Sequence, residues 1–174
     1  MRFDTITGQH IVKEHLRKMA DSGRIPHAIM LLGMPGSGDL PLAVGFAQYV
    51  LCENRKEGEA CGHCSNCVKA AKFVHPDIHF SFPTVGSKAT SDTYLGEWRK
   101  GLEENPYLDA NEWLQRIGAE NKQGNITKDE CLQIARKLSL KTFEGRYKIL
   151  VMWRPEYLGK EGNRLLKLIE EPPE

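Results

Sequence analysis

The chain has 174 residues, of which 40% are hydrophobic, and its formal net charge is +1. This length predicts about one domain with a sizeable core, and the near-neutral charge argues against a protein that wraps nucleic acid unaided. The sequence has no run of 18 apolar residues, which excludes a membrane-spanning helix, and its first residues show no signal-peptide pattern. We therefore expect a cytoplasmic protein with reduced thiols.

The N-terminal part predicts an alternation of helix and strand. A helix capped by Thr7 and running to about Asp21 is followed by an apolar run, residues 27–32, that is typical of a buried parallel strand. A glycine-rich turn then leads into a helix at about residues 37–53, which is apolar on almost all sides and is therefore expected to be central. Strand, glycine-rich turn and helix, in this order, form the arrangement that a phosphate-binding loop requires.

The C-terminal part repeats the alternation around one segment of different character. Residues 83–124 are polar and rich in Gly, Asn, Glu and Lys, and we interpret them as an insertion with two short helices. Thr127 and Glu130 form a capping-box pattern that predicts the start of a further helix. The remaining predicted elements are a short helix ending near residue 74, strands at 78–82 and 147–152, and a last helix at about 160–171. The whole pattern predicts an α/β fold with a parallel sheet covered on both faces.

The glycine-rich turn reads GMPGSGDL over residues 33–40 and keeps the spacing of the phosphate-loop pattern G-x-x-x-x-G-K-[ST]. Asp39 stands in place of the lysine, and Leu40 stands in place of the residue whose hydroxyl holds Mg²⁺. Replacing a cation by an anion about 4 Å from phosphate changes the Coulomb energy by several kcal/mol even at an effective dielectric constant of ~20. Backbone amides at the helix start can still hold an anion weakly. We therefore predict a vestigial phosphate loop that binds no ATP, formed by Gly33, Gly36, Ser37, Gly38, Asp39 and Leu40.

The acidic residue that a phosphate-loop ATPase carries at the end of a later strand is also missing. The apolar run 149–152 continues into Trp153, Arg154, Pro155 and Glu156. Glu156 is either a displaced acid or, as we favour, part of a solvated loop or helix cap. We therefore predict no catalytic residue in this chain. The alternative is an ATPase with relocated residues, in which Lys72 or Arg154 would replace the missing cation.

Four of the five cysteines predict a metal site, because they follow one another at C-x8-C-x2-C-x2-C spacing. Four thiolates suit tetrahedral Zn²⁺ and leave no open coordination position, so the predicted ion is structural. His63 lies between two of them and is either a substitute ligand or, as we favour, a loop residue. Cys131 is far along the chain and is predicted to be a core residue. A nucleic-acid-binding role for this module remains an alternative, against which its acidic residues argue. The predicted ligands are Cys52, Cys61, Cys64 and Cys67.

Several stretches together resemble the AAA+ subunits of the bacterial DNA polymerase III clamp loader. They are FDTITGQ at 3–9, RIPHA at 24–28, the cysteine spacing, HPD at 75–77 and NRLLKLIEEPP at 163–173. The resemblance covers most of the chain except the polar segment. It implies one AAA+ (RecA-like) domain over residues 1–174, with a small zinc module at 52–67 inserted in it. Because the chain stops where a helix ends, we expect it to be a piece of that domain.

The resemblance also implies a function. In this family the ATPase subunits (gamma/tau) keep the lysine and the acidic pair, whereas delta-prime subunits tolerate their loss. The chain thus resembles the delta-prime branch, a non-hydrolysing stator that is no enzyme by itself but is part of the polymerase holoenzyme. The implied partners are the gamma/tau and delta subunits and, through the complex, the sliding clamp and primed DNA, with no membrane. An active gamma/tau-like ATPase with a divergent nucleotide site is the alternative. The family's arginine finger, lid and collar would lie beyond Glu174.

Overall fold

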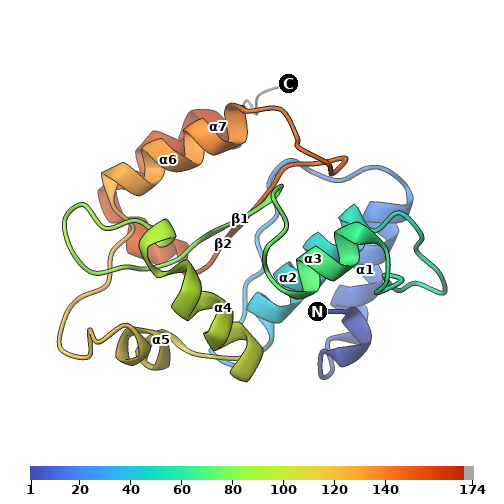
Figure 1. The fold of residues 1–174 in the computed structure, drawn as a ribbon, viewed down its shortest axis with the longest axis horizontal. Coiled ribbons are helices and arrows are strands. Elements are labelled where there is room, and N and C mark those ends of the chain that lie inside the picture. Colours follow the sequence, from blue (N-terminus) through green and yellow to red (C-terminus); the bar gives the residue numbers. More distant parts are fainter. Residues whose placement is uncertain (171–174) are drawn as a thin grey trace. The chain divides into compact units, whose positions relative to one another are not determined.

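The computed structural model describes residues 1–170 (Figure 1). The chain divides into two compact units. The first unit comprises Met1–Ile78 and Thr142–Ile149, and the second comprises His79–Lys141 and Leu150–Glu174. No helix within residues 1–170 combines the length and the apolar character needed to cross a bilayer.

The first unit is built around a buried helix. Its helices are α1 (His10–Asp21), α2 (Asp39–Leu51) and α3 (Ser65–Ala71), and α2 packs against both of the others. The apolar character of α2 predicted this central position, and ten of its thirteen residues are buried. The predicted cap of α1 is wrong. Gly8 and Gln9 both adopt left-handed backbone conformations, so the chain turns after Thr7 and the helix begins at His10.

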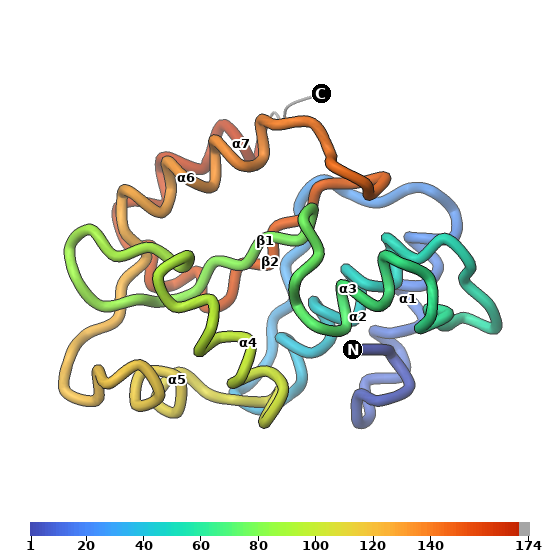
Figure 2. The backbone as a smooth tube through the Cα atoms, viewed as in Figure 1, coloured from blue at the N-terminus to red at the C-terminus, as the bar shows by residue number. Residues whose placement is uncertain are grey.

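The predicted strand at residues 27–32 does not form. Residues 28–36 are an irregular connection between α1 and α2 (Figure 2), and Met30 and Leu32 are 78% and 93% exposed. A strand is stable only when a neighbouring strand satisfies its amides and carbonyls. Among residues 1–170, no other segment forms a backbone ladder with this run, so its apolar character alone does not produce a strand.

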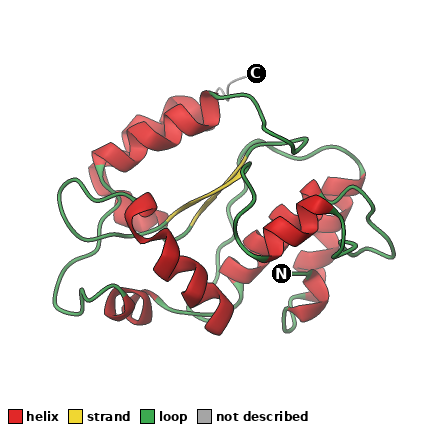
Figure 3. Cartoon of the chain, in the orientation of Figure 1, coloured by secondary structure: helices red, strands yellow, loops and turns green. Residues whose placement is uncertain are grey.

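One two-stranded sheet is present in the part of the chain that the structure describes (Figure 3), formed by β1 (Ile78–Ser81) and β2 (Ile149–Met152). The amide of Ile149 donates to the carbonyl of Asp77, and the amide of Trp153 donates to the carbonyl of Ser81, both at 2.8 Å. Donor and acceptor advance by four residues in the same direction, so the strands are parallel. The strands predicted at 78–82 and 147–152 are thus confirmed, and this mixture of helices with a parallel strand pair is consistent with an AAA+ domain.

The second unit contains the polar segment 83–124, whose tryptophans form its core. Trp98 and Trp113 are fully buried, and their rings meet edge to face at 5.1 Å. Phe82 stacks on Trp98 at 4.2 Å, and the indole N–H of Trp113 donates to the carbonyl of Pro83 at 2.7 Å. The two predicted short helices are α4 (Leu95–Glu104) and α5 (Ala110–Arg116), and a short 3-10 helix, η2 (Ser91–Tyr94), directly precedes α4. Its interpretation as an insertion stays a prediction.

The rest of the second unit comprises α6 (Lys128–Ser139), the 3-10 stretch η3 (Pro155–Leu165) and α7 (Leu166–Glu170). The hydroxyl of Thr127 accepts the amide of Glu130 at 3.1 Å, which confirms the predicted cap. Cys131 is 2% exposed and packs in a core cluster with residues of α6 and η3, as predicted. The predicted last helix is α-helical only from Leu166, because residues 160–165 belong to η3, which is wound more tightly than an α-helix. Its predicted end at residue 171 lies outside the described residues.

Candidate metal centre and phosphate-loop region

The four cysteines predicted to bind metal come together in the first unit. Their sulfur atoms all lie within 4.8 Å of one another, and the sulfurs of Cys61 and Cys67 are 3.9 Å apart. Tetrahedral Zn²⁺ with Zn–S bonds of about 2.3 Å requires sulfurs about 3.8 Å apart. Cys52 directly follows the last residue of α2, and Cys64 directly precedes the first residue of α3, so two helix ends hold the intervening loop in place. The donor set therefore fits a four-sulfur metal site.

Backbone amides point at the sulfurs. The amide of Cys61 donates to the sulfur of Cys52 at 3.2 Å, and the amide of Cys64 donates to the sulfur of Cys61 at 3.4 Å. Such hydrogen bonds favour the thiolate form and orient ligands toward a metal. His63 lies outside the sulfur cluster, because its Nδ1 is 2.8 Å from the carbonyl oxygen of Cys61 and its ring is exposed.

Electrostatics in the cluster also favour a cation. Burial raises the pKa of Cys52 and raises the pKa of Cys67 to about 12. Burial acts in the same direction on Cys61, but hydrogen bonds from the amide of Cys64 and from other neighbours lower the pKa of Cys61 to about 6. Burial thus disfavours the thiolate form of Cys52 and Cys67, and a divalent cation would offset that penalty.

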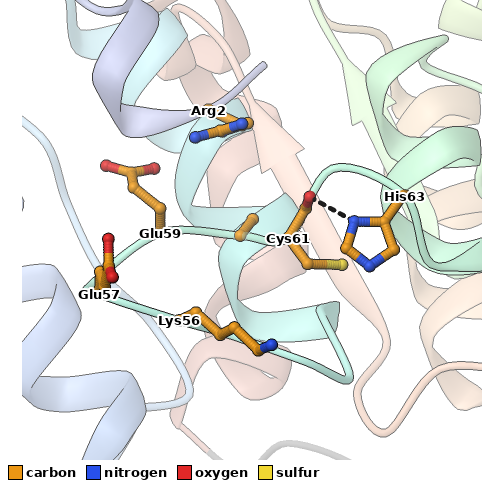
Figure 4. A pocket seen from close by; sticks show the side chains of 7 residues that line it. Arg2, Lys56, Glu57, Glu59, Cys61 and His63 are labelled. Atoms are coloured by element: carbon orange, nitrogen blue, oxygen red, sulfur yellow. Dashed lines mark hydrogen bonds between the residues drawn. The ribbon is translucent and has the colours of Figure 1, made fainter.

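A cavity of about 270 Å³ opens beside the cysteine cluster (Figure 4). Cys61 and His63 line it together with side chains of both charge signs, so the cavity has no strong preference for anions or cations. Glu59 is paired with Arg17 at 2.5 Å, which leaves less negative charge toward the cavity. The lining residues are Arg2, Lys56, Glu57, Glu59, Ala60, Cys61 and His63.

The glycine-rich turn keeps the shape of a tight loop. Gly36 and Gly38 have φ values of 78° and 96°, a region that side chains disfavour. Gly38 forms the N-cap of α2, as a phosphate loop requires. A Cβ atom at Gly33 would lie 2.1 Å from the Oγ atom of Ser37, so a larger residue there would displace the Ser37 hydroxyl. The glycines therefore close the loop on itself, and the Ser37 side chain lies against Gly33.

Polar groups of this loop are used within the protein. The amide of Ser37 donates to the carbonyl of Met34 at 2.9 Å, and the carbonyl of Ser37 accepts the side-chain amide of Gln9 at 2.8 Å. Asp39 lies in the first turn of α2, where a carboxylate interacts well with the helix dipole. Leu40 is 3% exposed, so its side chain belongs to the core. The sequence analysis did not predict the contact from Gln9, because the sequence separation between Gln9 and Ser37 gives no sign that the two residues meet.

A phosphate-loop ATPase carries an acidic residue directly after a strand such as β2. In this chain a core residue of the second unit, Trp153, follows β2 instead. Trp153 is 3% exposed and packs against Trp98 at 5.4 Å between ring centroids. Arg154 has a left-handed φ of 59°, and its guanidinium lies over the Trp153 ring at 5.5 Å. Glu156 is exposed and lies 3.5 Å from Arg154, which agrees with a solvated position.

The comparisons with known proteins identify the family. A family described as DNA polymerase III, delta subunit, matches residues 8–174. DNA polymerase III subunit delta' of Escherichia coli (strain K12) is 30% identical over 95 residues, which cover 55% of this chain and 28% of that protein. The Yersinia pestis subunit delta' is 25% identical over 154 residues, covering 88% and 35%. DNA polymerase III subunit gamma/tau of Mycobacterium tuberculosis (strain ATCC 25618 / H37Rv) is 24% identical over 173 residues, covering 99% and 24%.

The chain therefore belongs to the DNA polymerase III delta subunit family, which confirms the resemblance seen in the sequence. It spans only about a quarter to a third of the length of these relatives.

Proposed function

We propose that this chain is part of a delta-prime type clamp-loader subunit that does not hydrolyse nucleotide. In this proposal it is a cytoplasmic stator. Neighbouring gamma/tau ATPase subunits move against it, and the complex, with the delta subunit, opens the sliding clamp and places it on primed DNA. The observation that carries the proposal is the loop at the start of α2, where Asp39 brings the wrong charge and the Leu40 side chain is buried.

The loop contacts support this proposal in physical terms. A phosphate loop works by presenting free amides, a lysine and a hydroxyl to the nucleotide. Here the amide of Ser37 is bonded to Met34, and the two chemical groups are absent. A surface freed from the nucleotide cycle can be kept for packing against neighbouring subunits.

One observation favours the alternative, an active gamma/tau-like ATPase. The gamma/tau relatives align along 99% of this chain, further than the Escherichia coli subunit delta' does. Relocated cationic residues would then have to serve the nucleotide.

Nucleotide binding separates the two proposals. We expect labelled ATP with Mg²⁺ to show no saturable binding to the chain, because the anion at Asp39 repels the phosphates. The matched control is Asp39→Lys, which restores the charge sign at a partly exposed position and should bind at least about tenfold more tightly. Micromolar affinity and turnover in the unmodified chain would overturn the stator proposal.

Partnership is tested by reconstitution of the complex. The full-length protein should join a ring with the gamma/tau and delta subunits. Assembly without this protein, or its exclusion from the ring, would contradict the assignment.

We further propose that Cys52, Cys61, Cys64 and Cys67 hold one structural Zn²⁺ ion. When bound, the ion would cross-link the end of α2 to the start of α3 and fix the loop between them. Elemental analysis should find about one zinc per chain. The double variant Cys61→Ser/Cys64→Ser should lose the zinc, whereas Cys131→Ser, at the buried fifth cysteine, should retain it. Full zinc content in the double variant would refute this site.

A further inference from the structure

A chain of hydrogen bonds begins in the cysteine module and leads away from it through the first unit. Asn66 lies between Cys64 and Cys67 and is 5% exposed. Its side-chain NH₂ group donates to the carbonyl of Leu51 at 3.0 Å and to the carboxylate of Glu53 at 3.1 Å. Its Oδ1 atom lies 3.1 Å from Nε2 of a second buried residue, His75. Both polar groups of the Asn66 side chain are thus engaged.

The neighbouring contacts fix the tautomer of His75. The amide of Asp77 donates to Nδ1 of His75 at 3.1 Å, so Nδ1 is an acceptor and carries no proton. Nε2 therefore carries the hydrogen and donates it to Oδ1 of Asn66. The side chain is fully buried, and this burial lowers the pKa of His75, which favours the neutral ring. The direction of each hydrogen bond is consequently defined.

The series of hydrogen bonds ends at Asp77, whose side chain binds the backbone of loop 143–145. The Asp77 carboxylate accepts three consecutive backbone amides, from Phe143 at 2.7 Å, Glu144 at 2.9 Å and Gly145 at 2.7 Å. A Cβ atom at Gly145 would lie 2.9 Å from Leu51 and 3.2 Å from the carboxylate, so the loop approaches closely only because this residue is glycine. The loop is therefore fixed by specific contacts, although the Phe143 side chain is 82% exposed.

We propose that Asn66, His75 and Asp77 form a tether through which the cysteine module sets the conformation of loop 143–145. The module holds Asn66, Asn66 orients His75, and His75 orients the amide of Asp77, whose carboxylate holds the loop. An ordered module thereby presents Phe143 in a fixed position, and a disordered module releases it. The dependence on metal rests on the proposed zinc site, whereas the tether itself rests on the contacts among these side chains.

Hydrogen exchange of the loop amides tests the tether in the full chain. We expect the variant Asn66→Ala to raise the exchange rates of the amides at 143–145 by about fivefold, the effect of one lost hydrogen bond. The matched control is Asn121→Ala, an exposed asparagine of the second unit, which should leave these rates unchanged. If Asn66→Ala unfolds the module, the variant His75→Phe provides the test instead. Phenylalanine removes the hydrogen bonds of His75 to Asn66 and Asp77, while Asn66 keeps its bonds to Leu51 and Glu53. Unchanged loop exchange in His75→Phe would overturn the proposal.

Removal of metal by a chelator tests the coupling separately. Metal loss, followed by elemental analysis, should raise exchange at residues 61–67 and at 143–145 together. Faster exchange in the module alone would overturn the proposed coupling. A protein purified without metal would refute the zinc site, and the two tether variants would still decide whether the module holds the loop.

Discussion

Replacing Leu40 with serine would restore a hydroxyl at the position where an active phosphate loop holds Mg²⁺. We expect this change to destabilise the first unit. Leu40 is the second residue of the buried helix α2 and is 3% exposed, so the substitution removes most of a core side chain. Truncating a buried leucine costs about 2–5 kcal/mol in the free energy of unfolding, from lost transfer energy and the cavity left behind. A buried hydroxyl without a partner adds to this cost. We therefore expect a loss of about 3 kcal/mol.

The assay is urea unfolding followed by far-UV circular dichroism. Tryptophan fluorescence does not report on this unit, because all three tryptophans lie in the second unit. With a denaturant slope of about 2 kcal/mol per M, the midpoint of the first unit should fall by about 1.5 M. The control Leu40→Met keeps the volume and should cost less than about 1.5 kcal/mol. A urea midpoint for Leu40→Ser within error of that of the unmodified protein would show that the core does not need the Leu40 side chain. The argument that Leu40 serves packing rather than Mg²⁺ binding would then fail.

Three further predictions concern buried side chains. Trp98→Ala should lower the stability of the second unit by about 3–5 kcal/mol, measured by fluorescence of the remaining tryptophans. Glu130→Gln should cost about 1–3 kcal/mol, because its carboxylate accepts both the amide and the hydroxyl of Ser91 at 2.8 Å; thermal unfolding checks this. At Asp77, burial raises the pKa, but three amide donors outweigh it and the net pKa lies below the ordinary 3.8. Its contribution to stability is therefore complete above that value and is lost as pH falls through the lower folded-state pKa. Stability measured between pH 2 and 6 should show this loss, and Asp77→Asn should remove it.

Features that depend on residues close in sequence were predictable. Thr127 caps α6 as predicted, because an N-cap hydroxyl needs only the amide three residues later. The gathering of the four cysteines was predictable for the same reason, since short spacings bring sulfurs to one side of a turn.

Features that depend on distant partners were not predictable. The carboxylate of Glu130 was expected to close the capping box, but it bonds Ser91 from a distant segment. The apolar run at 27–32 was expected to be a strand, but strand formation depends on a neighbour that periodicity does not reveal. The contacts that Asp77 makes with residues 143–145 gave no signal beyond a short motif, because they join positions more than sixty residues apart.

Helix α2 has a mechanical consequence. Gly38 and the glycine-rich turn lie at its first residue, and Cys52 of the cysteine module follows its last, about 20 Å away for a helix of this length. Because most of its residues are buried, the helix cannot bend or slide without disturbing the core, so its two ends move as one rigid rod. A partner that binds the cysteine module therefore also fixes the orientation of the glycine-rich turn at the other end of α2. If that turn takes no nucleotide, as proposed, such a rod transmits force without itself switching between states.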